Sequence, residues 1–157
     1  MKTCDLCDRH EGRIRVPALA WRDYGGRIAF SGEVSTVKAL EDNSKVREAV
    51  AEPGRGRVLV VDGGGSLQRA MVGDMLAAQA LANGWSGLVV HGAVRDSAAL
   101  AGLDLGVKAL GTCPRRTGKL GQGLRDVPVV LAGIPLAPGD WLYADEDGVV
   151  VADAPLD

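Results

Sequence analysis

Two apolar runs, separated by about one helix length of chain, constrain the fold of this 157-residue sequence more than any other feature. The first is VLVV at residues 58–61, and the second is GLVV at residues 87–90. Continuous apolar runs of this length are typical of strands that are covered on both faces. Between them, residues 73–82 carry apolar side chains on one stripe and predict a helix that ends at Asn83-Gly84. We therefore expect a βα crossover at the centre of the fold.

Shorter elements are expected on both sides of this unit. The whole chain, residues 1–157, suits one α/β domain with a single core and a mixed sheet. The expected elements are a short N-terminal helix or arm (1–11), β-like runs (27–30 and 34–38), a helix (45–51) capped by Asp42-Asn43-Ser44, a short helix ending near Gly102, a third short strand (107–109), a basic loop (112–125) and closing strands (127–130, 141–143 and 149–151).

Composition excludes several classes of protein. The net charge of −2 and the aromatic content of 4% do not favour binding to nucleic acid or to an anionic membrane. No apolar run approaches the roughly 18 residues that a membrane span requires. The N-terminus is polar and lacks the apolar stretch of a secretory signal. We expect a cytoplasmic protein without direct nucleic-acid or membrane partners.

Two short motifs point to sites that the sequence does not complete. Cys4-x-x-Cys7, with His10 nearby, could be half of a zinc site, but no second pair supplies the remaining ligands. Three cysteines also argue against a disulfide framework, so free thiols are the simpler interpretation. The glycines at 63–65 follow a strand, yet Gln68 stands where the dinucleotide fingerprint needs its last glycine. Neither zinc nor a nucleotide is favoured.

Charged residues follow the two most strand-like runs, where ligands usually bind in an open α/β sheet. Asp62 follows the first run, and Arg95-Asp96 follow the second. Asp74 stands at the start of the expected central helix. A carboxylate that can hold a divalent cation, beside a guanidinium that can hold a substrate anion, is typical of a lyase site. Arg95 and Asp74 are the candidate catalytic residues.

The start of the same helix offers an anion site. There the free amides of Met75 and Leu76 would point outward, and Gly73 has no side chain to block an approaching ligand. Together with Asp74 and Arg95, these residues form the candidate substrate-binding set. A carboxylate would lie between a helix N-terminus on one side and a guanidinium on the other.

Structural alternatives remain open for each of these residues. Asp74 could simply cap its helix, and Arg95-Asp96 could be a surface pair and a cap. Asp62 could bind the amides of its own turn. His91 could be a base, although a structural histidine is the simpler alternative.

Several segments resemble the RraA-like family, named for the regulator of ribonuclease E activity A. That family includes the class II 4-hydroxy-4-methyl-2-oxoglutarate aldolases. The resemblance covers nearly the whole chain. The segments that carry it are residues 30–43, 58–66, 73–74, 91–96, 111–116 and 141–148.

The resemblance implies a swivelling β/β/α fold and a homotrimer with active sites near subunit interfaces. It also implies a divalent cation, Mg²⁺ or Mn²⁺, and a small 2-oxo acid substrate that contains a pyruvate unit. The family signature runs Gly, twenty residues, Arg-Asp, two residues, then Glu or Asp. In this chain Asp74 precedes the twenty-residue spacer, Arg95 and Asp96 match, and Ala99 replaces the closing acid.

Residue roles follow from the same resemblance. Asp96 would be the metal ligand, and Arg95 would stabilise the enolate of pyruvate. The amides of Met75 and Leu76 would hold the substrate carboxylate, and Asp74 would position a water. Oxaloacetate decarboxylation passes through the same enolate and is an expected second activity.

An alternative function in the same family needs no catalysis. Some members bind ribonuclease E and inhibit it. The basic loop, with Arg115, Arg116, Lys119 and Arg125, could contact such a partner; a solvated loop or a wall of the anionic substrate pocket is the simpler interpretation.

Overall fold

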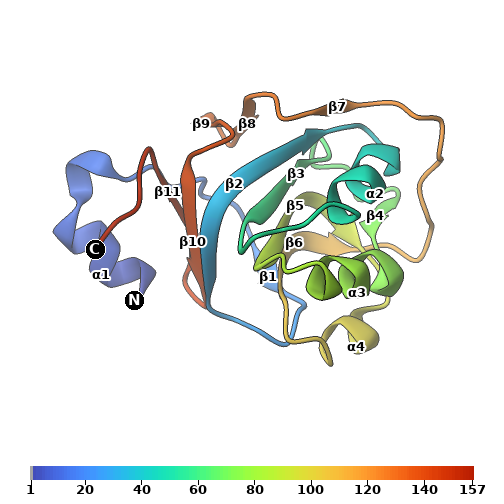
Figure 1. Ribbon diagram of the computed structural model, residues 1–157, viewed down its shortest axis with the longest axis horizontal. Helices are drawn as coiled ribbons and strands as arrows, with labels where there is room; N and C mark the ends of the chain where they lie inside the picture. The colour runs from blue at the N-terminus through green and yellow to red at the C-terminus, as the bar shows by residue number, and fades with distance from the viewer. Residues whose placement is uncertain (1) are drawn as a thin grey trace.

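Figure 1 shows a curled mixed sheet at the centre of the computed structural model, which describes residues 2–157. The strands are β1 (Arg22–Asp23), β2 (Phe30–Lys38), β3 (Val58–Asp62), β4 (Ala70–Val72), β5 (Gly87–Val94), β6 (Gly106–Thr112), β7 (Leu124–Arg125), β8 (Val129–Leu131), β9 (Ile134–Leu136), β10 (Trp141–Asp145) and β11 (Gly148–Ala152). The main sheet runs β1-β6-β5-β3-β2-β10-β11, with β4 beside β5 and β7 beside β2, while β8 and β9 form a separate hairpin. β2 to β6 pair in parallel with one another, and the outer strands are antiparallel. The predicted mixed α/β fold with βα crossovers is confirmed.

Helices cover one region of this sheet and leave another to the chain ends. They are α1 (Thr3–Arg9), the 3₁₀ turn η1 (Glu11–Arg13), α2 (Ser44–Val50), α3 (Asp74–Ala82) and α4 (Ser97–Leu100). Figure 1 shows α2 and α3 packed together on one side, whereas α1 and both termini lie beyond β10 and β11. No helix within residues 2–157 has both the length and the apolar character to span a membrane.

The central strand β3 is buried on both faces, as its apolar run predicts. Val58–Val61 have no exposed surface. Leu59 and Val61 pack into the core beneath α2 and α3, while Val58 and Val60 face the second core under β8, β9 and β10. This alternation follows from the pleat of a strand, which sends successive side chains to opposite faces. One strand therefore joins the two cores.

The predicted helices and buried strands are confirmed within one or two residues at most ends, but β2 differs from the prediction. Residues 30–38 form one strand, not two short runs beginning at residue 27. Gly32 interrupts the apolar pattern in its middle, because a side chain there would collide with the carbonyl oxygen of Gly56. The short strands β4, β7 and β9 have no counterpart in the prediction. Three residues or fewer carry too little periodicity to be recognised.

A buried polar cluster ties α1 to the far end of the sheet. Asp145, at the end of β10, accepts hydrogen bonds from the Thr3 amide and hydroxyl, each at 2.7 Å. The side chain of Lys108, only 1% exposed, donates to the Asp145 carbonyl and pairs with Asp23 at 3.0 Å. Each buried charge in the cluster therefore has a partner, as burial of charge requires.

Acidification is expected to weaken this tie. Burial raises the pKa of Asp145, but hydrogen bonds from Thr3 and from the Asp147 amide, with the charge of Lys108, outweigh it and leave the pKa below its usual value. A lowered pKa stabilises the fold above the pKa of the unfolded state, and that contribution is lost as pH falls through the folded-state pKa. Asp145→Asn should therefore cost about 1–3 kcal/mol of unfolding free energy in urea near pH 7. The difference from wild type should shrink below about pH 4.

The exposed variant Asp5→Asn is the matched control for this measurement, because it removes a carboxylate from the same helix without removing a contact of Asp145. An Asp145→Asn deficit of equal size at pH 3 and pH 7 would contradict the assignment.

Candidate active site

The site forms where β4 leads into α3, beside the end of β5. β4 pairs in parallel with the last residues of β5, and the Arg95 amide continues this pairing by donating to the Val72 carbonyl at 2.9 Å. Gly73 is thereby held against Arg95 and Asp96. A Cβ atom added to Gly73 would lie 2.6 Å from Asp96 Oδ2 and 3.4 Å from Arg95 Nε. The two halves of the sequence motif meet because of β4.

Asp96 links the two halves through its side chain. It occupies the N-cap position of α4 with φ 58° and ψ 41°, a left-handed conformation that Asp and Asn adopt more readily than other non-glycine residues. Its Oδ2 atom accepts a hydrogen bond from the Asp74 amide at 3.0 Å and lies 4.0 Å from Arg95 Nε. Asp96 therefore caps α3 across the site and makes no side-chain cap of its own helix. Because both side chains of the Arg95–Asp96 pair are partly exposed, the surface-pair alternative stays open.

The N-terminus of α3 presents two further amides. The first bond within the helix runs from the Ala77 amide to the Gly73 carbonyl at 3.1 Å, so the amides of residues 74–76 precede the helical ladder. Asp96 takes the first of them. Those of Met75 and Leu76 have no partner within the helix, and their role as an anion site stays a prediction.

Asp74 does not cap its own helix. Gly73 holds the N-cap position, and Asp74 is the first helical residue. The exposed carboxylate of Asp74 lines the same pocket as Arg95 and Asp96. The structural alternative for Asp74 is therefore wrong, and its side chain is available to a ligand.

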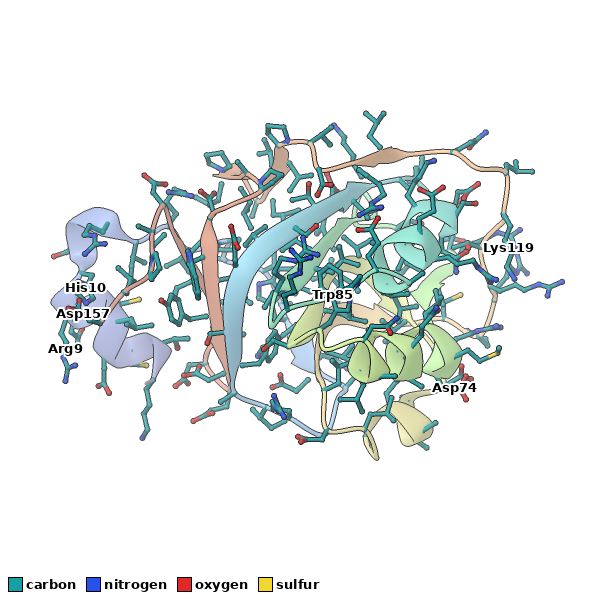
Figure 2. The ribbon with its side chains drawn as sticks, in the orientation of Figure 1. Arg9, His10, Asp74, Trp85, Lys119 and Asp157 are labelled. Atoms are coloured by element: carbon teal, nitrogen blue, oxygen red, sulfur yellow. The ribbon has the colours of Figure 1, made fainter. Side chains whose placement is uncertain are left out.

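A pocket of about 380 Å³ joins these groups to the basic loop. This volume is in the range of small-molecule sites. Figure 2 shows Lys119 on the loop and Asp74 at the start of α3, on the same side of the molecule. The lining residues are Asn43, Arg47, Ala70, Gly73, Asp74, Met75, Leu76, Gln79, Arg95, Asp96, Arg116 and Lys119.

The basic loop divides between two environments. Arg116 and Lys119 line the pocket, as one interpretation of the sequence proposed. Arg125 lies in β7 and forms a two-pronged ion pair with Glu52, at 2.7 and 3.0 Å. Arg115 is exposed and does not line the pocket. Of the four basic residues, only Arg116 and Lys119 therefore belong to the site.

Asp42 holds this loop over the pocket. Its carboxylate accepts hydrogen bonds from the Ser44 amide at 2.9 Å and from the Leu120 amide at 2.6 Å. Burial raises the pKa of Asp42, but these hydrogen bonds outweigh it and leave the pKa below its usual value. Asn43 holds the N-cap position of α2 without a side-chain cap bond, and Asp42, one residue earlier, binds the first amide of the helix. The same charged carboxylate fixes the backbone beside Lys119.

Two of the residues that follow the strands lie outside the pocket lining. Asp62 accepts a hydrogen bond from the Gly64 amide at 2.9 Å, the turn role given as its structural alternative. The same oxygen accepts a bond from His91 Nδ1 at 3.3 Å. The half-buried His91 is therefore held by Asp62, and the structural interpretation applies to both residues.

The donor set for a divalent cation is sparse but chemically suitable. Among residues 2–157, no three His, Cys, Asp or Glu side chains gather where they could share a metal. Asp96 and Asp74 supply carboxylate oxygens to one pocket, and Mg²⁺ accepts few protein ligands because it keeps several waters. Ala99, exposed in α4, adds no ligand. The Asp96 carboxylate could therefore hold Mg²⁺ or Mn²⁺, with water as the remaining ligands.

The residues of the N-terminal Cys-x-x-Cys motif are not arranged as a ligand cluster. Cys4, Cys7 and His10 belong to no cluster of ligands in the described part of the chain. Cys4 donates to Asp147 at 3.4 Å, and this bond raises the pKa of the Cys4 thiol. His10 bonds the Asp157 carbonyl at 3.0 Å. The three cysteines are free thiols, as the simpler interpretation held.

Four lining residues were not predicted as site residues: Asn43, Arg47, Ala70 and Gln79. Asn43 donates from its side chain to the Met71 carbonyl at 3.3 Å, which fixes α2 against the strand that leads to Gly73. Arg47 lies one turn further along α2, and Gln79 lies on α3. The i, i+4 spacing of Asn43 and Arg47 was the available signal. This spacing could not be assigned to the pocket without knowing that α2 packs against α3.

The fold and the site define a mixed α/β protein with a small, charged pocket at the C-terminal ends of parallel strands. A family model described as RraA-like: Aldolase/RraA matches residues 3–151. The chain therefore belongs to the RraA-like family. The resemblance to this family seen in the sequence is thus confirmed.

Similar proteins carry different names. A protein of Alkalilimnicola ehrlichii, 61% identical over 96% of this chain and 93% of its own, is named "Putative 4-hydroxy-4-methyl-2-oxoglutarate aldolase". A Geobacillus kaustophilus structure described as S-adenosylmethionine: 2-dimethylmenaquinone methyltransferase is 47% identical with a TM-score of 0.98, covering 99% of this chain and 97% of its own. The RNA-processing inhibitor RraA from Thermus thermophilis is 41% identical with a TM-score of 0.96, covering 100% and 95%. One fold thus carries three names, so function has to be argued from the site.

Proposed function

We propose that this chain is a divalent-metal-dependent class II aldolase that cleaves 4-hydroxy-4-methyl-2-oxoglutarate, or a related pyruvate aldol, to pyruvate. One observation carries the proposal. Around Gly73, the carboxylate of Asp96, the guanidinium of Arg95 and the free amides of α3 converge on one small pocket. The name of the 61% identical relative supports the same activity.

The residues suit the binding of a 2-oxo carboxylate. The amides of Met75 and Leu76 would hold the carboxylate at the positive end of the α3 dipole. Arg95 would donate to the keto oxygen, since its side chain reaches the same pocket. A divalent cation at Asp96 would supply further positive charge at that oxygen and fix the orientation of the substrate.

Cleavage moves one proton and one electron pair. A water positioned by Asp74 would accept the proton of the C4 hydroxyl, the C3–C4 bond would break, and the electron pair would move to the C2 oxygen. The resulting enolate of pyruvate carries its charge where Arg95 donates. Protonation at C3 gives pyruvate. Oxaloacetate loses carbon dioxide through the same enolate, so a secondary oxaloacetate decarboxylase activity belongs to the proposal.

The Arg95→Ala variant tests this assignment. Because Arg95 would stabilise charge that develops in the transition state, its loss should lower pyruvate release about 100- to 1,000-fold. Release is measured by coupling pyruvate to lactate dehydrogenase and following NADH. Arg95→Lys keeps the charge but loses the planar guanidinium, so its activity should lie between those of wild type and Arg95→Ala. Full activity in Arg95→Ala would exclude the role.

Binding and inhibition of ribonuclease E stays the alternative function. The neighbour described as an RNA-processing inhibitor gives it some support. Its single discriminating test is a pull-down of ribonuclease E by the purified chain, with Arg116→Gln and Lys119→Gln as variants of the exposed basic loop. Capture that these changes abolish, without any pyruvate release by wild type, would favour the alternative.

We also infer a homotrimer. The inference is supported by large apolar side chains that stand exposed, since exposed apolar surface often marks an interface. Leu40, Leu120 and Leu124 are 67%, 76% and 57% exposed. Sedimentation equilibrium should give three times the chain mass of 16.3 kDa, and a monomer would contradict the inference.

A further inference from the structure

Arg47 is a pocket cation with no assigned role. It is exposed on α2, one turn after Asn43, and both residues line the pocket. The ion pair along α2 joins Lys45 to Glu48 at 3.1 Å. The next acid, Glu52, is held by Arg125 at 2.7 Å. Within residues 2–157, Arg47 forms no ion pair, so its guanidinium is available to a ligand.

The charges of the pocket are unevenly distributed. Four cationic side chains line it against two carboxylates, those of Asp74 and Asp96. Both carboxylates lie on the α3 side, where Asp96 stands 4.0 Å from Arg95. The other three cations come from α2 and the basic loop: Arg47, Arg116 and Lys119. The pocket therefore carries an excess of positive charge.

The cationic wall is held in place by the backbone. The Ala70 amide donates to the Arg115 carbonyl at 2.7 Å, which fixes the chain beside Arg116. The Gly118 amide donates to the Glu41 carbonyl at 3.2 Å, and the Leu120 amide donates to Asp42, which fixes the chain on both sides of Lys119. Like charges repel one another, so three cations held around one cavity favour an anionic ligand between them.

We propose that Arg47 determines specificity by binding the second carboxylate of a dicarboxylic 2-oxo acid substrate. The inference rests on the proposed function, which places the first carboxylate at the amides of Met75 and Leu76. A second carboxylate, at the other end of the substrate, would then bind Arg47 on α2. Arg47 can bind it with two parallel hydrogen bonds, which a lysine cannot provide.

The test compares two pyruvate aldols in the Arg47→Met variant, which keeps the aliphatic stem and the helix. 4-Hydroxy-4-methyl-2-oxoglutarate carries a second carboxylate, and 4-hydroxy-2-oxopentanoate does not. For the dicarboxylate, kcat/KM should fall about 10- to 100-fold, mostly through KM, since a hydrogen bond to a charged group contributes that much affinity. For the monocarboxylate, kcat/KM should stay within about 2-fold of wild type, since no such bond is lost.

Arg9→Met is the matched control. Arg9 is exposed on α1, which lies at the opposite end of the molecule from Lys119 (Figure 2). The Arg9→Met variant should leave kcat/KM for both substrates unchanged. Equal losses for both substrates in Arg47→Met would overturn the inference, because a general defect does not discriminate between them. Unchanged turnover of both would also overturn it.

A binding measurement separates this inference from the proposed function. Isothermal titration compares 2-oxoglutarate with 2-oxobutanoate in the presence of Mg²⁺, and needs no turnover. Preference for the dianion in wild type, lost in Arg47→Met, supports the role of Arg47 even if no pyruvate is released. Equal affinities of the wild-type protein for 2-oxoglutarate and 2-oxobutanoate would overturn the role of Arg47. Pyruvate release would still support the aldolase activity in that case.

Discussion

Asp96→Asn is expected to lower pyruvate release at least about 100-fold, because it removes the carboxylate charge that would hold the cation at the site. The substitution conserves most of the local structure. Asn tolerates the left-handed conformation of residue 96, and its amide oxygen can still accept the hydrogen bond that the Asp74 amide donates at 3.0 Å. The Asp96→Asn variant therefore removes the charge with little change in packing.

The readout combines activity with stability. The midpoint of thermal unfolding should stay within about 3 °C of wild type, since the exposed charge contributes little to packing. Asp8→Asn, which removes an exposed carboxylate at the far end of the molecule, is the matched control. If Asp96→Asn retained most of the wild-type activity, Asp96 would not be the metal ligand.

Gly73→Ala is expected to lower pyruvate release by a similar factor, although it replaces no charged residue. The added Cβ would lie 2.6 Å from Asp96 Oδ2, closer than a Cβ atom can approach, so the carboxylate must move. The backbone itself accepts alanine, since φ −126° and ψ −167° are extended. We expect pyruvate release to fall about 100-fold through misplacement of the catalytic groups.

Stability should distinguish displacement from unfolding. The obstructed atom is the end of an exposed side chain, so the free energy of unfolding should change by less than about 1 kcal/mol. Gly12→Ala is the control, because a Cβ there meets no atom within 4 Å. A Gly73→Ala protein with wild-type activity would show that the position of Asp96 does not matter for the reaction.

The central residues of the site were predictable from the sequence because they follow chain order. In parallel βα units, the residues after consecutive strands meet at one edge of the sheet, so Asp74, Arg95 and Asp96 could be grouped without coordinates. The contact that joins them was not predictable. It depends on β4, a three-residue strand with no periodic signal, and on the side chain of Asp96 reaching the next helix.

The opposite wall of the pocket depends on packing between distant segments. Arg47 lines the pocket because α2 packs beside α3. Lys119 lines it because the neighbouring Leu120 amide donates a hydrogen bond to Asp42, which the sequence identifies as a helix cap. In the fold, β3 and β5 were predictable from their continuous apolar runs. The full length of β2 was not predictable, because glycine is required at position 32 by a carbonyl group from another part of the chain.

The most direct test of a metal-dependent aldolase is pyruvate release from 4-hydroxy-4-methyl-2-oxoglutarate as Mg²⁺ is removed and restored. The proposal predicts release with Mg²⁺, loss with a chelator and recovery when excess Mg²⁺ is added. Release that a chelator leaves unchanged, or no release at saturating Mg²⁺ and Mn²⁺, would contradict it.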